Sequence, residues 1–398
     1  MESSILKIKM YPAGNGDAFL ISSAGTNILV DGGYPRTFDK YILHDLCYLS
    51  NKGEDLDLVI TSHIDADHIS GLIRFLSLNG SLASPKIVEI KNIWHNSLRS
   101  LTTINSSDID LSDQQLLNSI CRRGHPSHVE YTSNEANEIS ARQGSSLAFL
   151  INSGGYIWNG NNGRTSISVE HTQMLNFPNG NIRVIGPTQP RLDDLLQWWK
   201  KQLQRLGYKG SKESGDLIDD AFEFLCEHSK ESNKINPVPL STGSHKKLKD
   251  VYTPDSSATN GSSIATIVEL EEVRILMLAD AWAEDIIQEL KILQSQGHSM
   301  IFDAIKVSHH GSLHNSSPEL FELIDAPKFI ISSNGNAHNH PDIEVLIEIV
   351  DRPASFSRTL YFNYATPSSN AIRKYCSKTG PSFTVLDNAT SWIEILKS

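Results

Sequence analysis

Residues 60–71 read ITSHIDADHISG and place four potential metal ligands within six positions. These are His63, Asp65, Asp67 and His68, and they directly follow the apolar, β-branched run DLVI. Neutral imidazoles and carboxylates are ligands for zinc, manganese or iron. Carboxylates packed this closely raise one another's pKa unless a cation compensates them, which is a physical reason to expect metal. The alternative is a capped helix start with surface aspartates.

Other strand-like segments also end at residues that can bind a ligand. TNILVDGG ends at Asp31, EVRILMLADA at Asp280, DAIKVSHHG at His309 and His310, and KFIISSNGNAHNHP in a loop that holds His340. In open α/β sheets, ligands bind just beyond the carboxyl ends of the strands. A carboxylate such as Asp280 can bridge two cations, and a histidine can complete a metal shell. The pattern therefore predicts a centre for one or two divalent ions, zinc or manganese.

The segments between these strand ends predict the helices that position the ligands. Apolar residues recur with helical spacing in residues 37–53, 69–80 and 283–297, and the second of these starts directly behind the His/Asp cluster. PELFELIDAP and PDIEVLIEIVD each begin with proline, which is favoured at a helix N-terminus. The alternation of short buried strands and helices indicates an α/β protein.

The stretch from about residue 81 to 250 has a different character. Residues 97–145 are rich in serine, asparagine and aspartate, so we expect a loop-rich insertion or a mobile lid there. Residues 190–207 and 216–231 have the spacing of two helices. The insertion is therefore expected to be partly lid and partly helical.

Composition limits the class of protein and its surroundings. The chain has 398 residues, 39% of them hydrophobic and 20% charged, as in ordinary globular proteins. Its formal net charge of −11 excludes a generic polyanion binder but not a nucleic-acid substrate, because metal ions can supply local positive charge. The four cysteines are scattered without a CxxC pair, which fits a reducing compartment. No signal peptide and no apolar run of about 18 residues are evident, so we expect a soluble cytoplasmic protein without membrane contact.

Taken together, the motifs resemble those of the metallo-β-lactamase fold. TSHIDADHISG is similar to the signature HxHxDH, with Asp65 in place of the second histidine. DGG at 31–33 resembles the first motif of that superfamily, LMLADA its bridging-aspartate motif, and VSHHGS at 307–312 its last histidine motif. The motifs GNGDAF, NGSSIA, LADA and HNHPDIEVL resemble more closely the ComEC-type branch, the metal-dependent domain of DNA-uptake proteins and its stand-alone relatives.

The resemblance runs from residue 5 to about residue 350 and is interrupted by the insertion. It implies a four-layer αββα metallo-β-lactamase sandwich with a loop-rich and helical insertion. Residues 1–398 would then form a single domain, with the insertion at about 81–250. The site would lie along one edge of the two sheets.

The resemblance also implies roles for individual residues. A first metal would be held by His63 and Asp65, with Asp280 bridging to a second metal held by Asp67, His68 and one of His309 and His310. Which histidine of that pair is the ligand stays open, and the other would meet the substrate. Asp67 would also position the attacking water, and Asp31 would orient the cluster. His340 would either contact substrate or cap the following helix, so the catalytic candidates are Asp67, His310 and His340.

The first metal site departs from the superfamily pattern. The third motif usually supplies a histidine about 20 residues before the bridging aspartate, but the corresponding region TPDSSATNGSSIA offers only Asp255 and Asn260. An oxygen-rich first site favours manganese or a loosely held second ion.

Three functions remain open from the sequence. The first is a metal-dependent phosphodiesterase or nuclease acting on nucleic acid or a smaller phosphodiester. By analogy with stand-alone relatives, it would be an effector of a bacterial antiviral defence system with a partner protein. The second is a carbon-ester, thioester, lactone or lactam hydrolase, against which Asp65 and the missing histidine weigh. The third is a non-catalytic regulatory module, which the intact set of metal residues disfavours.

Overall fold

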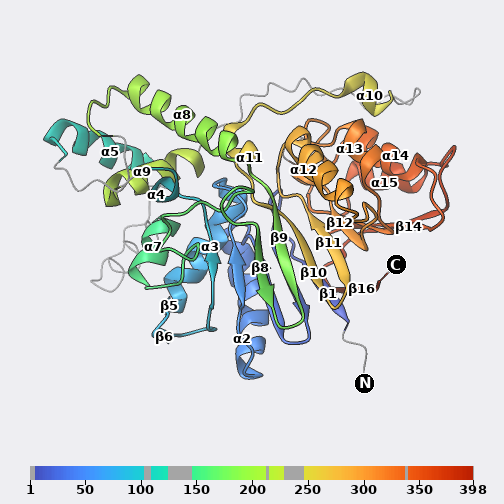
Figure 1. The fold of residues 1–398 in the computed structure, drawn as a ribbon, viewed down its shortest axis with the longest axis horizontal. Helices are drawn as coiled ribbons and strands as arrows, with labels where there is room; N and C mark the ends of the chain where they lie inside the picture. Colours follow the sequence, from blue (N-terminus) through green and yellow to red (C-terminus); the bar gives the residue numbers. More distant parts are fainter. Residues whose placement is uncertain are drawn as a thin grey trace. The chain divides into compact units, whose positions relative to one another are not determined.

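The computed structural model describes residues 5–102, 109–123, 146–211, 215–227, 246–336 and 339–397. The chain divides into two compact units, and Figure 1 shows their helices and strands. Unit 1 comprises Met1–Thr26, Ser168–Thr188 and Glu231–Ser398, and unit 2 comprises Asn27–Ile167 and Gln189–Lys230. Within the described ranges, no helix has both the length and the apolar character needed to cross a membrane.

Unit 1 contains an eight-stranded sheet in the order β15-β14-β13-β12-β11-β10-β9-β8. Its strands are β8 (Met174–Phe177), β9 (Gly180–Gly186), β10 (Ala265–Leu270), β11 (Val273–Met277), β12 (Ala304–Lys306), β13 (Lys328–Ile331), β14 (Arg358–Phe362) and β15 (Phe383–Leu386). Strands β8 to β11 pair antiparallel, whereas β11 to β15 pair parallel. The carboxyl ends of the parallel strands lie at one edge of the sheet. Asp280 follows β11 and the His309–His310 pair follows the neighbouring strand β12, so these residues lie at that edge.

A three-stranded antiparallel group also belongs to unit 1. It consists of β16 (Trp392–Ile395), β1 (Leu6–Met10) and β2 (Phe19–Ser23). The loop between β1 and β2 carries the GNGDAF motif, and its Asp17 is buried.

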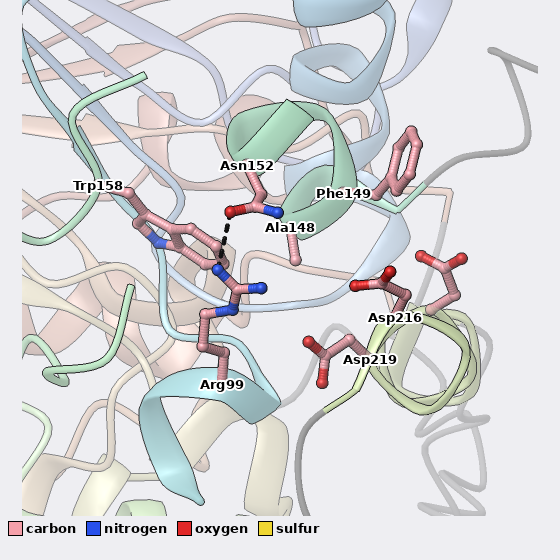
Figure 2. A pocket seen from close by; sticks show the side chains of 8 residues that line it. Arg99, Ala148, Phe149, Asn152, Trp158, Asp216 and Asp219 are labelled. Atoms are coloured by element: carbon pink, nitrogen blue, oxygen red, sulfur yellow. Dashed lines mark hydrogen bonds between the residues drawn. The ribbon is translucent and has the colours of Figure 1, made fainter. Parts of the chain in front are cut away.

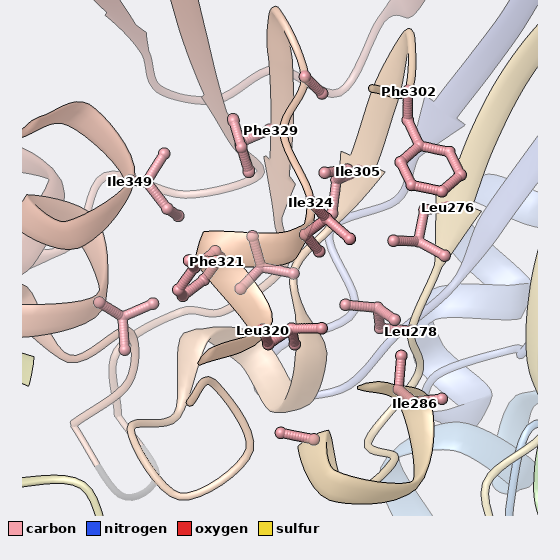
Figure 3. Close-up of a cluster of buried hydrophobic side chains, with 14 of the residues drawn as sticks. Leu276, Leu278, Ile286, Phe302, Ile305, Leu320, Phe321, Ile324, Phe329 and Ile349 are labelled. Atoms are coloured by element: carbon pink, nitrogen blue, oxygen red, sulfur yellow. The ribbon is translucent and has the colours of Figure 1, made fainter. Parts of the chain in front are cut away.

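The core of unit 1 lies between the eight-stranded sheet and its helices (Figure 3). The helices are α10 (Leu248–Val251), α11 (Ala258–Gly261), α12 (Ala283–Ser295), α13 (Pro318–Leu323), α14 (Ile343–Asp351) and α15 (Pro367–Arg373), with a 3-10 turn at Ser308–Gly311. Leu276, Ile305 and Phe329 of the strands belong to the same buried cluster as Ile286 of α12 and Ile349 of α14. The amphipathic pattern at 283–297 thus correctly predicted α12.

The start of α14 differs from the expectation that Pro341 opens the helix. The helix begins at Ile343, and Asp342 before it is extended, with φ −72° and ψ 135°. The Asp342 carboxylate accepts a hydrogen bond from the backbone N–H of Leu313 at 2.8 Å, which holds it outside the helix. The helix at Pro318, by contrast, starts with proline as expected.

Unit 2 is built on the parallel strands β3 (Thr26–Val30, in this unit from Asn27), β4 (Leu58–Ile60) and β7 (Ile93–Trp94). A small hairpin joins β5 (Gly80–Ser81) and β6 (Ser84–Pro85). The helices are α1 (Pro35–Thr37), a π-helical turn (Phe38–Ile42), α2 (Leu43–Asn51), α3 (Ala66–Asn79), α4 (Leu98–Leu101), α5 (Leu111–Arg123), α7 (Leu147–Ser153), α8 (Gln189–Leu206) and α9 (Asp216–Glu227). The helices expected at 37–53, 69–80 and 190–207 are confirmed, as is the described part of the one expected from residue 216.

The expectation of a loop-rich segment at 97–145 is wrong for part of its described residues. These include α4 and the 13-residue helix α5. Leu117 and Ile120 of α5 are buried, because their helical spacing places them on one face despite the polar composition. Taken together, the packed sheets and helices are α/β and consistent with an αββα sandwich that carries insertions.

Two glycines allow the start of α3 to lie against the end of β3. The backbone N–H of Gly32 donates to the carbonyl of His68 at 2.9 Å, and that of Gly71 donates to the carbonyl of Gly33 at 2.7 Å. A Cβ atom on Gly71 would lie 2.0 Å from the carbonyl oxygen of Gly32. The contact therefore requires glycine, and it fixes His68 next to Asp31.

Gly71→Ala is expected to lower the free energy of unfolding by about 2 kcal/mol, because the backbone of β3 has to move away from α3. Denaturant unfolding measures the effect. Ser77→Ala is the control on the same helix, where the side chain makes one hydrogen bond, to the carbonyl of Arg74. Equal losses in the two variants would contradict the close contact.

Candidate metal centre

The structure brings the four predicted ligands of unit 2 together at the junction of β4 and α3. His63 lies in the connecting loop, Asp65 directly precedes α3, and Asp67 and His68 lie in its first turn. The rings of His63 and His68 have centroids 4.1 Å apart. Nε2 of His63 lies 3.5 Å from Oδ2 of Asp65, and Nε2 of His68 lies 4.0 Å from Oδ1 of Asp67. The short spacing in sequence thus becomes a spatial cluster of two imidazoles and two carboxylates.

Asp31, at the end of β3, holds this cluster in place. Its buried carboxylate accepts hydrogen bonds from the backbone N–H and the hydroxyl of Ser62, at 2.7 and 2.6 Å. Nδ1 of His68 lies 2.9 Å from Oδ2 of Asp31 and donates to it, because an ionised carboxylate only accepts. Nε2 is then the acceptor nitrogen of His68, the arrangement found in metal-binding histidines. The contact agrees with the expected orienting role of Asp31.

One atom of the unit 2 cluster shows directly that the residues suit a cation. Oδ1 of Asp65 is enclosed, yet it accepts no hydrogen bond within the described ranges. An enclosed carboxylate oxygen without a donor is costly unless a cation compensates it. Imidazole nitrogens and carboxylate oxygens are a suitable donor set for Zn²⁺ or Mn²⁺.

Unit 1 contains a second cluster, around Asp280 beyond the end of β11. Oδ2 of Asp280 lies 3.7 Å from Nε2 of His309 and 3.6 Å from Nε2 of His310. Both rings are held at Nδ1, His309 by Oδ1 of Asn315 at 2.7 Å and His310 by the carbonyl of Ser332 at 2.8 Å. The two histidines therefore present the same nitrogen to Asp280, and both remain candidate ligands.

The backbone at this pair of histidines is strained. His309 has φ 45° and ψ 54°, and His310 has φ 57° and ψ 18°. Left-handed conformations of this kind cost roughly 1–3 kcal/mol each in residues other than glycine, and they concentrate at functional sites. The backbone N–H of His309 donates to the carbonyl of Ala279 at 2.9 Å, which ties the strained turn to the residue before Asp280.

Asn315, which the sequence did not single out, connects the two residues of the third-motif region to His309. Oδ2 of Asp255 accepts hydrogen bonds from Nδ2 of Asn260 at 2.8 Å and from Nδ2 of Asn315 at 3.0 Å. Asn315 in turn accepts from His309 and also donates to the carbonyl of Asp280, at 3.0 Å. This region thus supports His309 through an intervening amide.

Lys306, the last residue of β12, is a second residue that the sequence did not single out. Its side chain is 1% exposed and donates to the carbonyl of Ala279 at 2.9 Å. It forms an ion pair with Asp17, and its Nζ lies 3.7 Å from Oδ1 of Asp280. Asp17, from the GNGDAF motif, therefore belongs to the unit 1 cluster.

His340 lies beside the same cluster. Its ring centroid is 5.5 Å from that of His309, and its Nδ1 lies 3.2 Å from Oδ2 of Asp342, the residue that precedes α14. Burial lowers the pKa of the His340 imidazole. The structure thus shows a contact at the helix start, and the catalytic role of His340 stays a prediction.

His95 is a further histidine at the strand ends of unit 2 that the sequence did not single out. It follows β7, and its Nε2 lies 2.7 Å from Oε1 of Glu223 in α9. Glu223 also accepts the backbone N–H groups of Leu147 and Ala148, at 2.6 and 3.0 Å. These contacts tie α9 and the start of α7 to the sheet. In α9, burial raises the pKa of the Cys226 thiol.

A small pocket in unit 2 lies among α4, α7 and α9 (Figure 2). Arg99 donates to Oδ1 of Asn152 at 2.8 Å, and its guanidinium lies 5.5 Å from the Trp158 ring. Opposite stand Asp216 and other carboxylates of α9, among them Asp220, whose pKa burial raises to about 6. None of the predicted metal ligands lines this pocket.

Comparison with known proteins supports the resemblance for part of the chain. Residues 11–101 match the family model of the metallo-beta-lactamase superfamily. This segment includes the whole unit 2 cluster, whereas Asp280, His309 and His310 lie beyond it. No curated protein matches the chain. Residues 11–101 therefore form a metallo-beta-lactamase superfamily segment, which suggests a metal-dependent hydrolase.

Proposed function

We propose that the protein is a metal-dependent phosphodiesterase, with a nucleic acid or a smaller phosphodiester as substrate. The donor set of the unit 2 cluster carries the proposal. It pairs His63 and His68 with two carboxylates, and the enclosed Oδ1 of Asp65 accepts no hydrogen bond within the described residues. A carboxylate in place of the usual second histidine makes the site richer in oxygen, which suits manganese and phosphodiester chemistry.

Each of the two clusters is proposed to supply ligands to a divalent ion. The ligands are His63, Asp65, Asp67 and His68 from unit 2, and Asp280 with one of His309 and His310 from unit 1. A divalent ion bound there would lower the pKa of a water molecule and neutralise charge on a phosphate oxygen. Three of the candidate histidines are held at Nδ1, which supports this proposal: His68 by Asp31, His309 by Asn315 and His310 by the Ser332 carbonyl.

The remaining proposed roles are those of Asp67, His310 and His340. The Asp67 side chain is 19% exposed and those of His63 and His68 at most 1%, so Asp67 can reach a water molecule and accept its proton. His310 and His340 are proposed to bind the substrate phosphate. Both lie beside His309, with ring centroids 5.7 and 5.5 Å from its own.

The ComEC-type motifs and the net charge bear on the biological setting. A chain with a formal net charge of −11 does not attract DNA non-specifically, so a partner protein delivers the nucleic acid or the substrate is small. We propose a role in bacterial antiviral defence by analogy with stand-alone relatives of that branch. That analogy concerns the motifs and not the site geometry.

A substrate screen tests the proposed function. Purified protein with Mn²⁺ or Zn²⁺ is incubated with single-stranded DNA, double-stranded DNA, RNA and cyclic nucleotides, and p-nitrophenyl acetate serves as the carbon-ester arm. We expect metal-dependent cleavage of at least one phosphodiester. Turnover of the carbon ester without cleavage of any phosphodiester would instead support the alternative hydrolase.

A further inference from the structure

Lys306 places a buried positive charge inside the unit 1 cluster. It ends β12, where it pairs in register with Met277 of β11 and Ile330 of β13. With a side chain only 1% exposed, its ammonium group has exchanged water for the Ala279 carbonyl and the carboxylates of Asp17 and Asp280. A buried ammonium is tolerated only with such partners.

The two carboxylates around Lys306 come from distant parts of the chain. Asp17 lies in the loop between β1 and β2, and Asp280 lies beyond β11. Their side chains are 1% and 3% exposed. Buried carboxylates that share a site repel one another unless a cation lies nearby. The ammonium of Lys306 therefore compensates a pair of charges that would otherwise drive these two segments apart.

The two oxygens of the Asp280 carboxylate face different partners. Oδ1 of Asp280 lies 3.7 Å from Nζ of Lys306, whereas Oδ2 lies 3.6 and 3.7 Å from Nε2 of His310 and His309. One oxygen of the carboxylate thus faces the lysine and the other faces the two candidate ligands.

We propose that Lys306 is a positioning residue, a resident cation that keeps Asp17 and Asp280 assembled when no metal is bound and directs Oδ2 of Asp280 toward the metal ligands. The inference rests on the proposed metal centre but not on the identity of the substrate. Lys306, Asp17 and Asp280 together carry a formal charge of −1, which becomes −2 without the lysine. In a Lys306 variant, a bound divalent ion would compensate the charges of Asp17 and Asp280 in place of the lysine. The stability of such a variant would therefore depend on metal.

The test measures the melting temperature of Lys306→Met with chelator and with added Mn²⁺. Methionine keeps an unbranched chain but removes the charge. We expect the metal-free variant to melt about 10 °C below the metal-free wild type. Mn²⁺ should then raise the melting temperature of the variant by clearly more than it raises that of the wild type.

A second substitution separates charge from packing. In the double variant Asp17→Asn/Lys306→Met, one uncompensated carboxylate is replaced by a neutral amide, so we expect the metal-free melting temperature to recover most of the loss. Lys91→Met is the control, because Lys91 pairs with Asp57 at 2.9 Å while its side chain is 47% exposed. The control should leave both the melting temperature and its response to Mn²⁺ close to wild type.

Three results would overturn the inference. One is a metal-free Lys306→Met as stable as the control, and another is an Mn²⁺ response equal to that of the wild type. The third is a double variant no more stable than the single one, including the case in which neither folds. A single variant that folds only with Mn²⁺, beside a double variant that folds without it, supports the inference. Wild-type protein that binds Mn²⁺ but cleaves no phosphodiester would contradict the proposed function and leave the role of Lys306 unaffected.

Discussion

Asp67→Ala is expected to lower the metal-dependent hydrolysis of bis(p-nitrophenyl) phosphate by about 10³-fold while the fold stays intact. Asp67 lies in the first turn of α3, with Oδ1 4.0 Å from Nε2 of His68 and a side chain 19% exposed. Truncation removes a proposed ligand and proton acceptor, but it leaves the apolar core untouched. The stability lost should not exceed about 1 kcal/mol, the usual worth of an acidic residue at a helix start.

The control for Asp67 is Asp45→Ala. Asp45 also lies in the first turn of a helix, α2, and it is not among the proposed ligands. The control should keep wild-type turnover and a similar melting temperature. Equal turnover by Asp67→Ala and the wild type would remove Asp67 from the catalytic assignment.

Asp280→Asn is expected to weaken metal binding by more than roughly 100-fold. Loss of a residue that only orients a metal ligand already weakens binding by about 10–100-fold. Asparagine keeps the shape of the side chain but presents a neutral amide to His309 and His310. Lys306 retains its ion pair with Asp17, so the substitution removes a proposed ligand without leaving the lysine unpaired. Metal content after dialysis against limiting Mn²⁺ measures the loss.

Two further variants make this metal measurement specific. Asp285→Asn is the control, because Asp285 is a buried carboxylate of unit 1 in the first turn of α12. His63→Asn removes a proposed ligand from unit 2. His63→Asn is expected to lower the metal content, as Asp280→Asn does. Wild-type metal content in either variant would remove that residue from the proposed ligands.

Much of the candidate site could be predicted from sequence because the signals are local. A buried strand followed by polar residues and an apolar helix placed His63, Asp67 and His68 at the β4–α3 junction, and the structure has them there. The expected proximity of Asp31 to this cluster is also seen, since parallel strands end at the same edge. These inferences needed only strand ends and helix starts.

The residues that were missed depend on contacts between distant segments. Lys306 in DAIKVSHH has the pattern of an outward-facing strand residue, and only the arrival of Asp17 and Asp280 makes its burial favourable. Asn315 lies in a polar loop without periodicity, and its role arises from Asp255 and His309. Hydrogen bonds over such separations leave no short-range sequence signal.

Local backbone conformation was the other limit. The sequence does not indicate that His309 and His310 adopt positive φ angles. Glycine and asparagine are the residues that commonly adopt positive φ, and histidine does so less often. The start of α14 was misplaced because Asp342 is held by a backbone donor at Leu313, which is remote in sequence from the helix it precedes. In both cases tertiary contacts override the local preference.

The most direct test of a metal-dependent phosphodiesterase is a metal titration of chelated wild-type protein. The rate of bis(p-nitrophenyl) phosphate hydrolysis is followed as Mn²⁺ is added back after complete chelation. We predict that chelation abolishes hydrolysis and that Mn²⁺ restores it, saturating at one to two ions per chain. Hydrolysis that survives chelation, or that no added divalent ion restores in protein that remains folded, would contradict the account.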